Sequence, residues 1–131
     1  MSRNDEYHLQ AQICDYLRLQ YPDALWQSDL SGIKLTVGQA VKVKRIKYGK
    51  YWPDLIVFEP RGGYNGLAIE IKRNGPEIYT RDGRLRQTAH IQGQAEMLAR
   101  FRERGYMAEF VCGFDEAQQM IDGYTRGHIP F

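Results

Sequence analysis

The chain has 131 residues, of which 43% are hydrophobic and 26% are charged, and its formal net charge at pH 7 is +2. A chain of this length and composition fits one globular domain with a self-sufficient core, so we expect residues 1–131 to form a single domain. No apolar run approaches the roughly 20 residues of a membrane helix, and the polar N-terminus does not resemble a signal peptide. We therefore expect a cytoplasmic protein without a membrane partner, in which Cys14 and Cys112 are free thiols.

The positive charge is unevenly distributed along the chain. No acidic residue occurs from Ile33 to Trp52, although this stretch contains Lys34, Lys42, Lys44, Arg45, Lys47 and Lys50. A second basic group follows further along the chain and comprises Arg81, Arg84 and Arg86. Locally positive surface of this kind attracts a phosphate backbone. The alternative interpretation is a solvated loop face that only increases solubility.

The first half of the chain predicts a helix followed by short strands. A helix is expected over residues 5–20, where Leu9, Ile13 and Leu17 form an apolar stripe, and a short strand over residues 24–28. The segment from Leu35 to Val43 is expected to be a hairpin or an irregular, glycine-containing insertion. A buried strand is predicted over residues 54–59, and a turn over residues 62–66.

The second half begins with an alternating strand over residues 67–72, in which Glu70 and Lys72 share one face. A flexible segment is expected over residues 74–86, a helix over 88–104, a strand over 106–112 and a short closing helix over 115–124. This order of elements predicts the α/β class, with a small mixed sheet flanked by helices.

Three polar residues carry the chemical prediction. If the strand after Asp54 pairs antiparallel with the strand that contains Glu70, the two carboxylates lie close enough to share one cation. Two carboxylates suit Mg²⁺ or Mn²⁺, which polarise a phosphodiester and activate an attacking water. Lys72 then supplies a compact positive charge at the same site. The alternative for the Glu-Ile-Lys triplet alone is a half-exposed strand with a surface Glu and Lys.

Other polar residues have two open interpretations. Glu6 shares the helix face of the apolar stripe, so its carboxylate points toward the core and serves a metal, or else it favours the first turn electrostatically. Gln94 shares the face of Ile91 and Leu98, so its amide bonds a metal-bound water or a phosphate, or else nearby backbone. His90 contacts phosphate or has a surface or capping role.

These residues together resemble the virus-type replication-repair nuclease (VRR-NUC) domain, a branch of the PD-(D/E)XK nucleases. The resemblance extends over nearly the whole chain and is carried by Glu6, by Gly49-Lys-Tyr-Trp-Pro-Asp54-Leu-Ile-Val, by Gly66-Leu-Ala-Ile-Glu70-Ile-Lys72, by Gln94-Ala-Glu-Met-Leu, by Gly105-Tyr-Met-Ala and by Gly113-Phe-Asp-Glu-Ala.

The resemblance implies a restriction-endonuclease-like α-β-β-β-α-β core and Mg²⁺- or Mn²⁺-dependent cleavage of DNA. It implies that Asp54 and Glu70 are metal ligands, that the Ile71 carbonyl is a main-chain ligand, and that Lys72 is the catalytic lysine. It also makes Glu6 and Gln94 site residues, with Glu6 beside the metal.

The chain is similar to the free-standing versions of the domain in phages and bacteria, which resemble Holliday-junction resolvases and are expected to act as homodimers. We therefore expect a structure-selective DNA endonuclease that works on branched DNA. The alternatives are a monomeric flap or nicking endonuclease and a non-catalytic DNA-binding module on a nuclease fold. Whether the basic stretch of residues 33–50 binds DNA or a partner subunit stays open.

Overall fold

The computed structural model describes residues 3–30 and 33–127. In chain order its elements are α1 (Arg3–Gln20), β1 (Trp26–Ser28), α2 (Val37–Ile46), β2 (Leu55–Val57), β3 (Leu67–Lys72), the 3₁₀ helix η1 (Gly75–Glu77), α3 (Ala89–Glu103), β4 (Met107–Cys112) and α4 (Gly113–Arg126). The predicted α/β class is confirmed, and so are most of the predicted elements.

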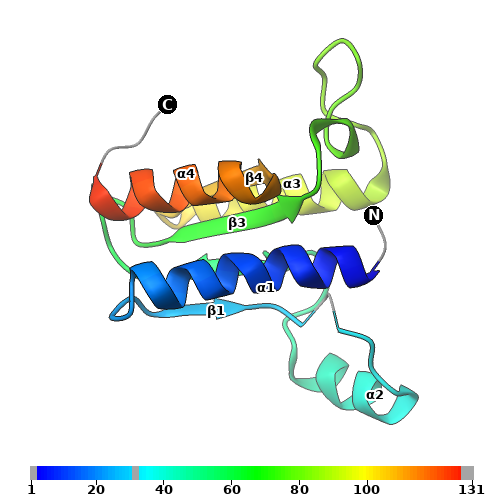
Figure 1. Ribbon diagram of the computed structural model, residues 1–131. Coiled ribbons are helices and arrows are strands. Elements are labelled where there is room, and N and C mark those ends of the chain that lie inside the picture. The colour runs from blue at the N-terminus through cyan, green and yellow to red at the C-terminus, as the bar shows by residue number, and fades with distance from the viewer. Residues whose placement is uncertain (1–2, 31–32, 128–131) are drawn as a thin grey trace.

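The four strands form one mixed sheet in the order β1-β2-β3-β4. β2 pairs antiparallel with both β1 and β3, whereas β3 and β4 run parallel. Leu55 pairs with Ile69, so the predicted antiparallel pairing across the 62–66 turn is confirmed. Helices α1 and α4 cover one face of this sheet and α3 covers the other (Figure 1).

The alternation along β3 decides which side chains enter which half of the core. Leu67, Ile69 and Ile71 pack into the cluster that includes residues of α1 and α4. Ala68 packs instead into the cluster formed with Met97, Leu98 and Phe101 of α3. Because Glu70 and Lys72 have the parity of Ala68, the strand directs both toward the α3 side of the sheet.

The segment expected to be a hairpin or an irregular insertion contains the helix α2, so that prediction is wrong. Thr36 caps the helix: its hydroxyl accepts from the Gln39 N–H, and the Gln39 side chain accepts from the Thr36 N–H. This reciprocal capping box satisfies two backbone donors at the first turn. No residue of α2 is buried, so packing in the core does not determine the sequence pattern of this helix.

Other segments differ in extent from the prediction: β1 and β2 are shorter than the strands expected over residues 24–28 and 54–59. Residues 74–86 include η1 and a small antiparallel bridge between Tyr79 and Leu85, with Gly83 at a φ of 83° in the turn. The closing helix α4 is longer at both ends than residues 115–124. Cys14 and Cys112 are free, as predicted. Within the described ranges, no helix is long and apolar enough to span a membrane.

Candidate active site

A cavity of about 540 Å³ lies where β2 begins and β3 ends. This end of the sheet is at the right of Figure 1, beside the start of α1. The cavity brings together all the site residues that the sequence predicts: Glu6, Asp54, Glu70, Ile71, Lys72 and Gln94. Residues from α1, β3 and α3 therefore share one concave surface.

Asp54 is held in place by main-chain contacts from two sides. Its Oδ2 accepts a hydrogen bond of 2.7 Å from the Ile71 N–H on the neighbouring strand. Its carbonyl accepts from the Asp29 N–H at 2.8 Å and from the Gln10 amide at 3.3 Å. The carboxylate is thus oriented by the strand that carries Glu70, which is the arrangement that the predicted strand pairing requires.

Glu70 is almost completely buried, with 2% of its surface exposed. Burial, the neighbouring Asp54 charge and a hydrogen bond with Asp54 raise the pKa of Glu70 to about 11, while Lys72 acts in the opposite direction. Its Oε2 is buried and has no hydrogen-bond partner among the described residues. A buried carboxyl oxygen without a partner is costly, so this position favours a positively charged ligand or a proton.

Lys72 and Gln94 complete the cavity on the α3 side. Lys72 is half-buried, two residues after Glu70 on the same face of β3. Gln94 is 6% exposed, and its Oε1 has no hydrogen-bond partner within residues 3–30 and 33–127. The predicted inward orientation of Gln94 is confirmed, and its oxygen is free to accept a bond from water or from a ligand in the cavity.

The whole arrangement has a counterpart among solved structures. The chain superposes on a protein described as a VRR_NUC domain protein, with a TM-score of 0.62 over 92% of this chain and 88% of that chain, at 23% sequence identity. The chain has the VRR_NUC fold. The resemblance predicted from the sequence is confirmed at the level of the fold, whereas no protein-family profile and no curated protein matches the sequence.

Glu6 lies on the cavity wall but differs from the prediction in its burial. Its side chain is exposed, so the expectation that the carboxylate points into the core is wrong. Glu6 faces His90 closely enough to act on its titration. Loss of water contact and the charge of Lys72 lower the pKa of His90, while Asp54 and Glu6 oppose that shift. Glu6 therefore sits at the rim, opposite the start of α3.

Sequence reasoning missed several residues that the VRR_NUC fold brings to the cavity. Gln10 lies one turn after Glu6 and donates to the carbonyls of Asp29 and Asp54, at 2.8 and 3.3 Å. Its spacing of four residues from Glu6 could have identified it. Asp29 follows β1, and its charge contributes to the raised pKa of Glu70. Lys47 forms an ion pair with Asp29 at 3.7 Å.

Tyr51 forms part of the cavity wall in a strained conformation. Its φ is 68°, the only positive value at a described residue other than glycine. The ring packs on Gly93 of α3, where an added Cβ would lie 2.3 Å from a ring carbon. It also meets the His90 ring edge-on, with 5.9 Å between the centroids. Such strain persists only where packing determines the conformation, and here Gly93 makes the room.

The donor set fits a divalent cation bound by two carboxylates. The described residues contain no group of three or more His, Cys, Asp or Glu side chains arranged to hold a metal ion. Mg²⁺ usually binds proteins through one or two carboxylates and keeps several waters, so a larger cluster is not required. Asp54 and the unpartnered Oε2 of Glu70 supply such a pair.

Proposed function

We propose that the chain is a nuclease that hydrolyses DNA phosphodiester bonds with Mg²⁺ or Mn²⁺ bound by Asp54 and Glu70. One observation carries the proposal: a fully buried Glu70 has an unpartnered oxygen beside Asp54, and Lys72 lies in the same cavity. The solved structure with the same fold is described as a VRR_NUC domain protein, a name that supports nuclease chemistry here.

The ligands of the cation would come from β3 and the residue before β2. Asp54 and Glu70 would be the side-chain ligands, with the Ile71 carbonyl as a main-chain ligand and Glu6 as a further carboxylate at the rim. A bound cation of this type polarises a phosphodiester and lowers the pKa of an attacking water. The Ile71 N–H keeps the Asp54 carboxylate oriented during this chemistry.

Lys72 and Gln94 would act on the reacting groups directly. Lys72 follows Glu70 by two residues on the same face of β3. Its ammonium group would offset the negative charge that develops on the phosphate. The Gln94 Oε1 would accept a hydrogen bond from the attacking water and so orient it. Both residues project from regular elements, Lys72 from β3 and Gln94 from α3, rather than from loops.

Cleavage with Mg²⁺ or Mn²⁺, and its loss with a chelator, tests this function. Asp54→Ala, Glu70→Ala and Lys72→Ala should each reduce cleavage of labelled DNA by at least about 100-fold, the scale for losing one electrostatic or general acid–base group. The two carboxylate variants should also lose Mn²⁺ affinity, whereas Lys72→Ala should largely keep it. Glu103→Ala is the matched control, because that carboxylate is 73% exposed at the far end of α3. Full activity in a folded Glu70→Ala protein would contradict the proposal.

The finer proposal is a structure-selective endonuclease that resolves branched DNA such as Holliday junctions. A monomeric flap or nicking endonuclease is the alternative within the same chemistry. A non-catalytic DNA-binding module is less consistent with a buried carboxylate pair beside a lysine, because binding alone does not require that arrangement. Labelled four-way junctions, forks, flaps and nicked duplexes, cleaved in parallel, distinguish these three activities.

A further inference from the structure

One part of the chain that projects from the body is a basic arm, which we define as residues 33–50 (Figure 1). The arm contains α2 and projects from the body below the sheet in Figure 1. It carries six basic residues and no acidic residue: Lys34, Lys42, Lys44, Arg45, Lys47 and Lys50. No residue of α2 is buried, so the fold does not use this helix to build its core.

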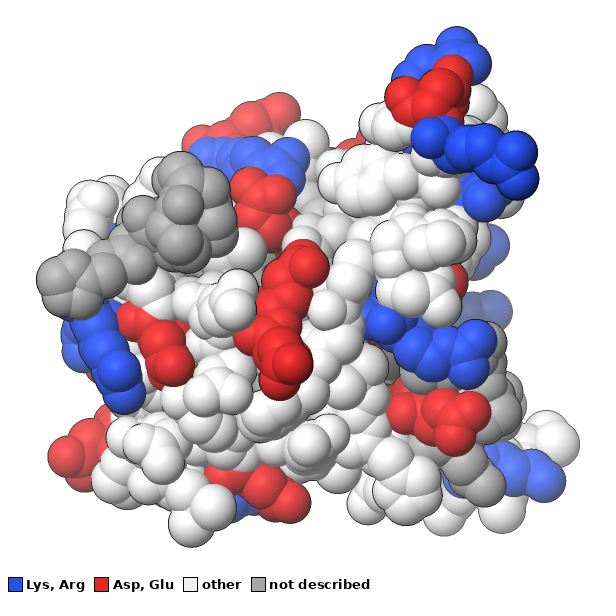
Figure 2. All heavy atoms as spheres, turned by 45° about the horizontal axis from the view of Figure 1, so that its top comes forward, with Lys and Arg blue, Asp and Glu red and all other residues white. Residues whose placement is uncertain are grey.

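The second basic segment, residues 73–87, differs from the arm in its charge balance. Arg84 pairs with Asp82 at 2.7 Å, and Arg73 pairs with Glu77 at 3.8 Å. On the face drawn in Figure 2, the projection at upper right carries acidic side chains beside basic ones. The positive charge of this segment is therefore partly neutralised within the segment, whereas that of the basic arm is not.

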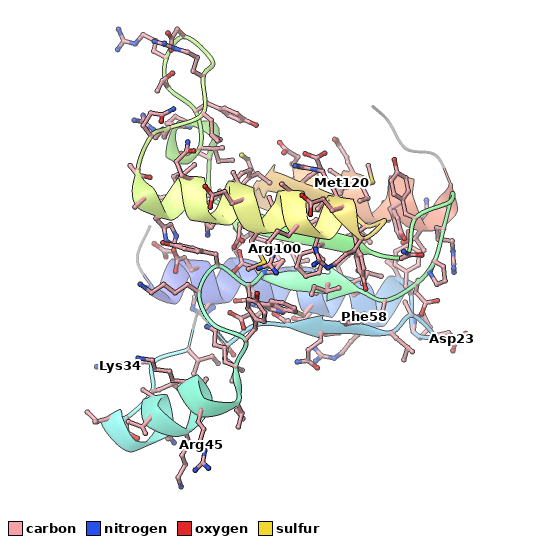
Figure 3. The ribbon with its side chains drawn as sticks, turned by 180° about the vertical axis from the view of Figure 1, so that it is seen from behind. Asp23, Lys34, Arg45, Phe58, Arg100 and Met120 are labelled. Atoms are coloured by element: carbon pink, nitrogen blue, oxygen red, sulfur yellow. The ribbon has the colours of Figure 1, made fainter. Side chains whose placement is uncertain are left out.

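The cations of α2 lie on its solvent-facing side, beside exposed apolar residues. Figure 3 shows Arg45 pointing away from the body of the molecule. Successive residues turn by about 100° around a helix, so Lys42 and Lys44 lie on opposite sides of this outward face. Val37 and Val41 lie between Lys44 and Arg45 on this face and are 85% and 64% exposed, and Ile46 at its edge is 85% exposed. The outward face therefore combines positive charges along both sides with exposed apolar side chains.

The positive charge continues from the arm into the cavity. Lys47, at the C-terminal end of α2, and Lys50 both line the cavity that contains Lys72. A phosphate backbone that reaches Lys72 can thus remain beside positive side chains as it leaves the site toward Lys42 and Arg45. Lys47 also anchors the arm, through its ion pair with Asp29.

The composition of α2 favours a duplex over a single strand. Proteins that bind single strands stack bases on aromatic side chains, and α2 contains no aromatic residue. Tyr48, the aromatic residue of the arm, is 61% exposed but packs against Trp52 and Arg100 rather than lying on α2. Duplex DNA presents charge outside and keeps its bases stacked, so an exposed basic helix without aromatic residues suits it. A helix about 10–12 Å across also fits a major groove about 12 Å wide.

We propose that the basic arm binds the phosphate backbone of double-stranded DNA beside the cavity. The substrate of this site is then DNA that is duplex on the arm side of the bond to be cut. This inference rests on the proposed nuclease function, because the bound DNA is called a substrate only if the site cleaves it. Duplex binding by the arm can nevertheless be measured without cleavage.

The test measures binding of fluorescent DNA by anisotropy in a chelator, over a range of salt concentrations. The arm variant is Lys42→Ala/Lys44→Ala/Arg45→Ala, and alanine preserves the helix because it has the highest helix propensity. The control, Arg18→Ala/Arg61→Ala/Arg104→Ala, removes the same charge from exposed side chains at the opposite end of the sheet. Circular dichroism checks that both variants keep the helical content of the parent chain.

The arm variant should bind a 20-base-pair duplex at least about tenfold more weakly at 0.1 M salt, and the slope of log K against log salt should fall by about 2–3. Arg45→Ala alone should reduce that slope by about 1, and the control should stay near the parent chain. Equal losses in the arm variant and the control would overturn the proposal, as would tighter binding of a single strand than of the duplex.

Two outcomes separate this inference from the proposed function. Arm-dependent duplex binding without cleavage in Mg²⁺ or Mn²⁺ would support DNA binding by the arm and contradict the proposed nuclease function. If the parent chain cleaves DNA and the arm variant binds the duplex as tightly as the parent does, DNA binding by the arm is contradicted and the nuclease function is not. If the arm variant changes only the oligomeric state in light scattering, the arm belongs to a subunit interface and the proposal is wrong.

Discussion

Glu70 is the residue on which the proposed chemistry depends most. A fully buried carboxyl next to another carboxylate destabilises the fold when both are charged. The pKa of Glu70 is raised by this environment, so the metal-free fold favours the protonated form. A bound cation would reverse that preference, because it compensates the charge that burial opposes.

The stability of the metal-free protein should therefore fall as pH rises above the usual carboxyl pKa of 4.5. The unfolded chain releases the Glu70 proton near that pH, whereas the fold holds it up to about 11. Over this window the unfolded state binds fewer protons, so the free energy of unfolding decreases by up to about 1.4 kcal/mol per pH unit. Glu70→Gln should abolish this component. Chemical denaturation in a chelator at pH 5 and pH 8 tests this, and equal pH slopes in both proteins would contradict it.

Glu6 tests whether an exposed carboxylate at the rim takes part in catalysis. Glu6→Gln should impair turnover more than stability if the carboxylate serves the metal. If Glu6 only favours the first turn of α1, turnover should stay normal and the free energy of unfolding should fall by a few tenths to about 1 kcal/mol. Turnover and melting temperature of this one variant distinguish the two roles.

At the scale of elements, the contact between α3 and Tyr51 positions the cavity wall. Gly93→Ala should destabilise the protein by about 1–3 kcal/mol, because the new Cβ collides with the Tyr51 ring. Cleavage should fall as well, since Tyr51 lines the cavity. Gly38→Ala in α2 is the matched control: it meets no atom within 4 Å and should stabilise the protein by up to about 1 kcal/mol. Similar melting temperatures for the two variants would show that the Tyr51 contact is not tight.

The elements that were predictable from sequence are those shaped by the core. The alternation along β3 predicted which side chains lie on each face of the strand, and the turn before it predicted the pairing with β2. These two predictions together placed Asp54 close to Glu70. Helix α2 was missed because no core contact imposes a helical period on it. The Thr36–Gln39 capping box was the evidence available for it in the sequence.

Two parts of the candidate site were not accessible from the sequence. Asp29 reaches the cavity only because Ser28 pairs with Leu55, and that register is set between strands far apart in the chain. Tyr51 reaches the cavity through a backbone conformation with positive φ. Glycine and asparagine are the residues that indicate such a conformation in a sequence, and a tyrosine does not. Asp29 and Tyr51 both depend on packing between elements, whereas Asp54, Glu70 and Lys72 follow from one local strand pair.

At the scale of the whole molecule, the cavity opens at one end of the sheet, and the basic arm projects beside it (Figure 1). The described part of the chain contains one candidate centre, formed by Asp54 and Glu70. A four-way junction, in contrast, requires cuts in two opposing strands. A C2 homodimer with an isologous interface would place two equivalent centres on one substrate.

We therefore expect a dimer in light scattering at micromolar concentration, and symmetric linear products from a mobile junction. A strict monomer that cuts flaps and leaves junctions intact would favour the flap-endonuclease alternative instead. Because such a monomer would still cleave flaps, this result would leave the proposed metal-dependent cleavage in place.

The strand pair from Asp54 to Lys72 has a consequence for the order in which the molecule folds. Its hydrogen bond from Ile71 to Asp54 joins residues only 17 positions apart, so little chain entropy is lost in closing that loop. The Gln10 contact with Asp54 spans 44 positions and closes a much longer loop. Because closing the shorter loop costs less chain entropy, we expect Asp54 and Glu70 to come together early in folding. The Ile71 amide should then gain protection from hydrogen exchange earlier than the Met107 amide, which donates to the distant Gly66 carbonyl when β4 joins β3.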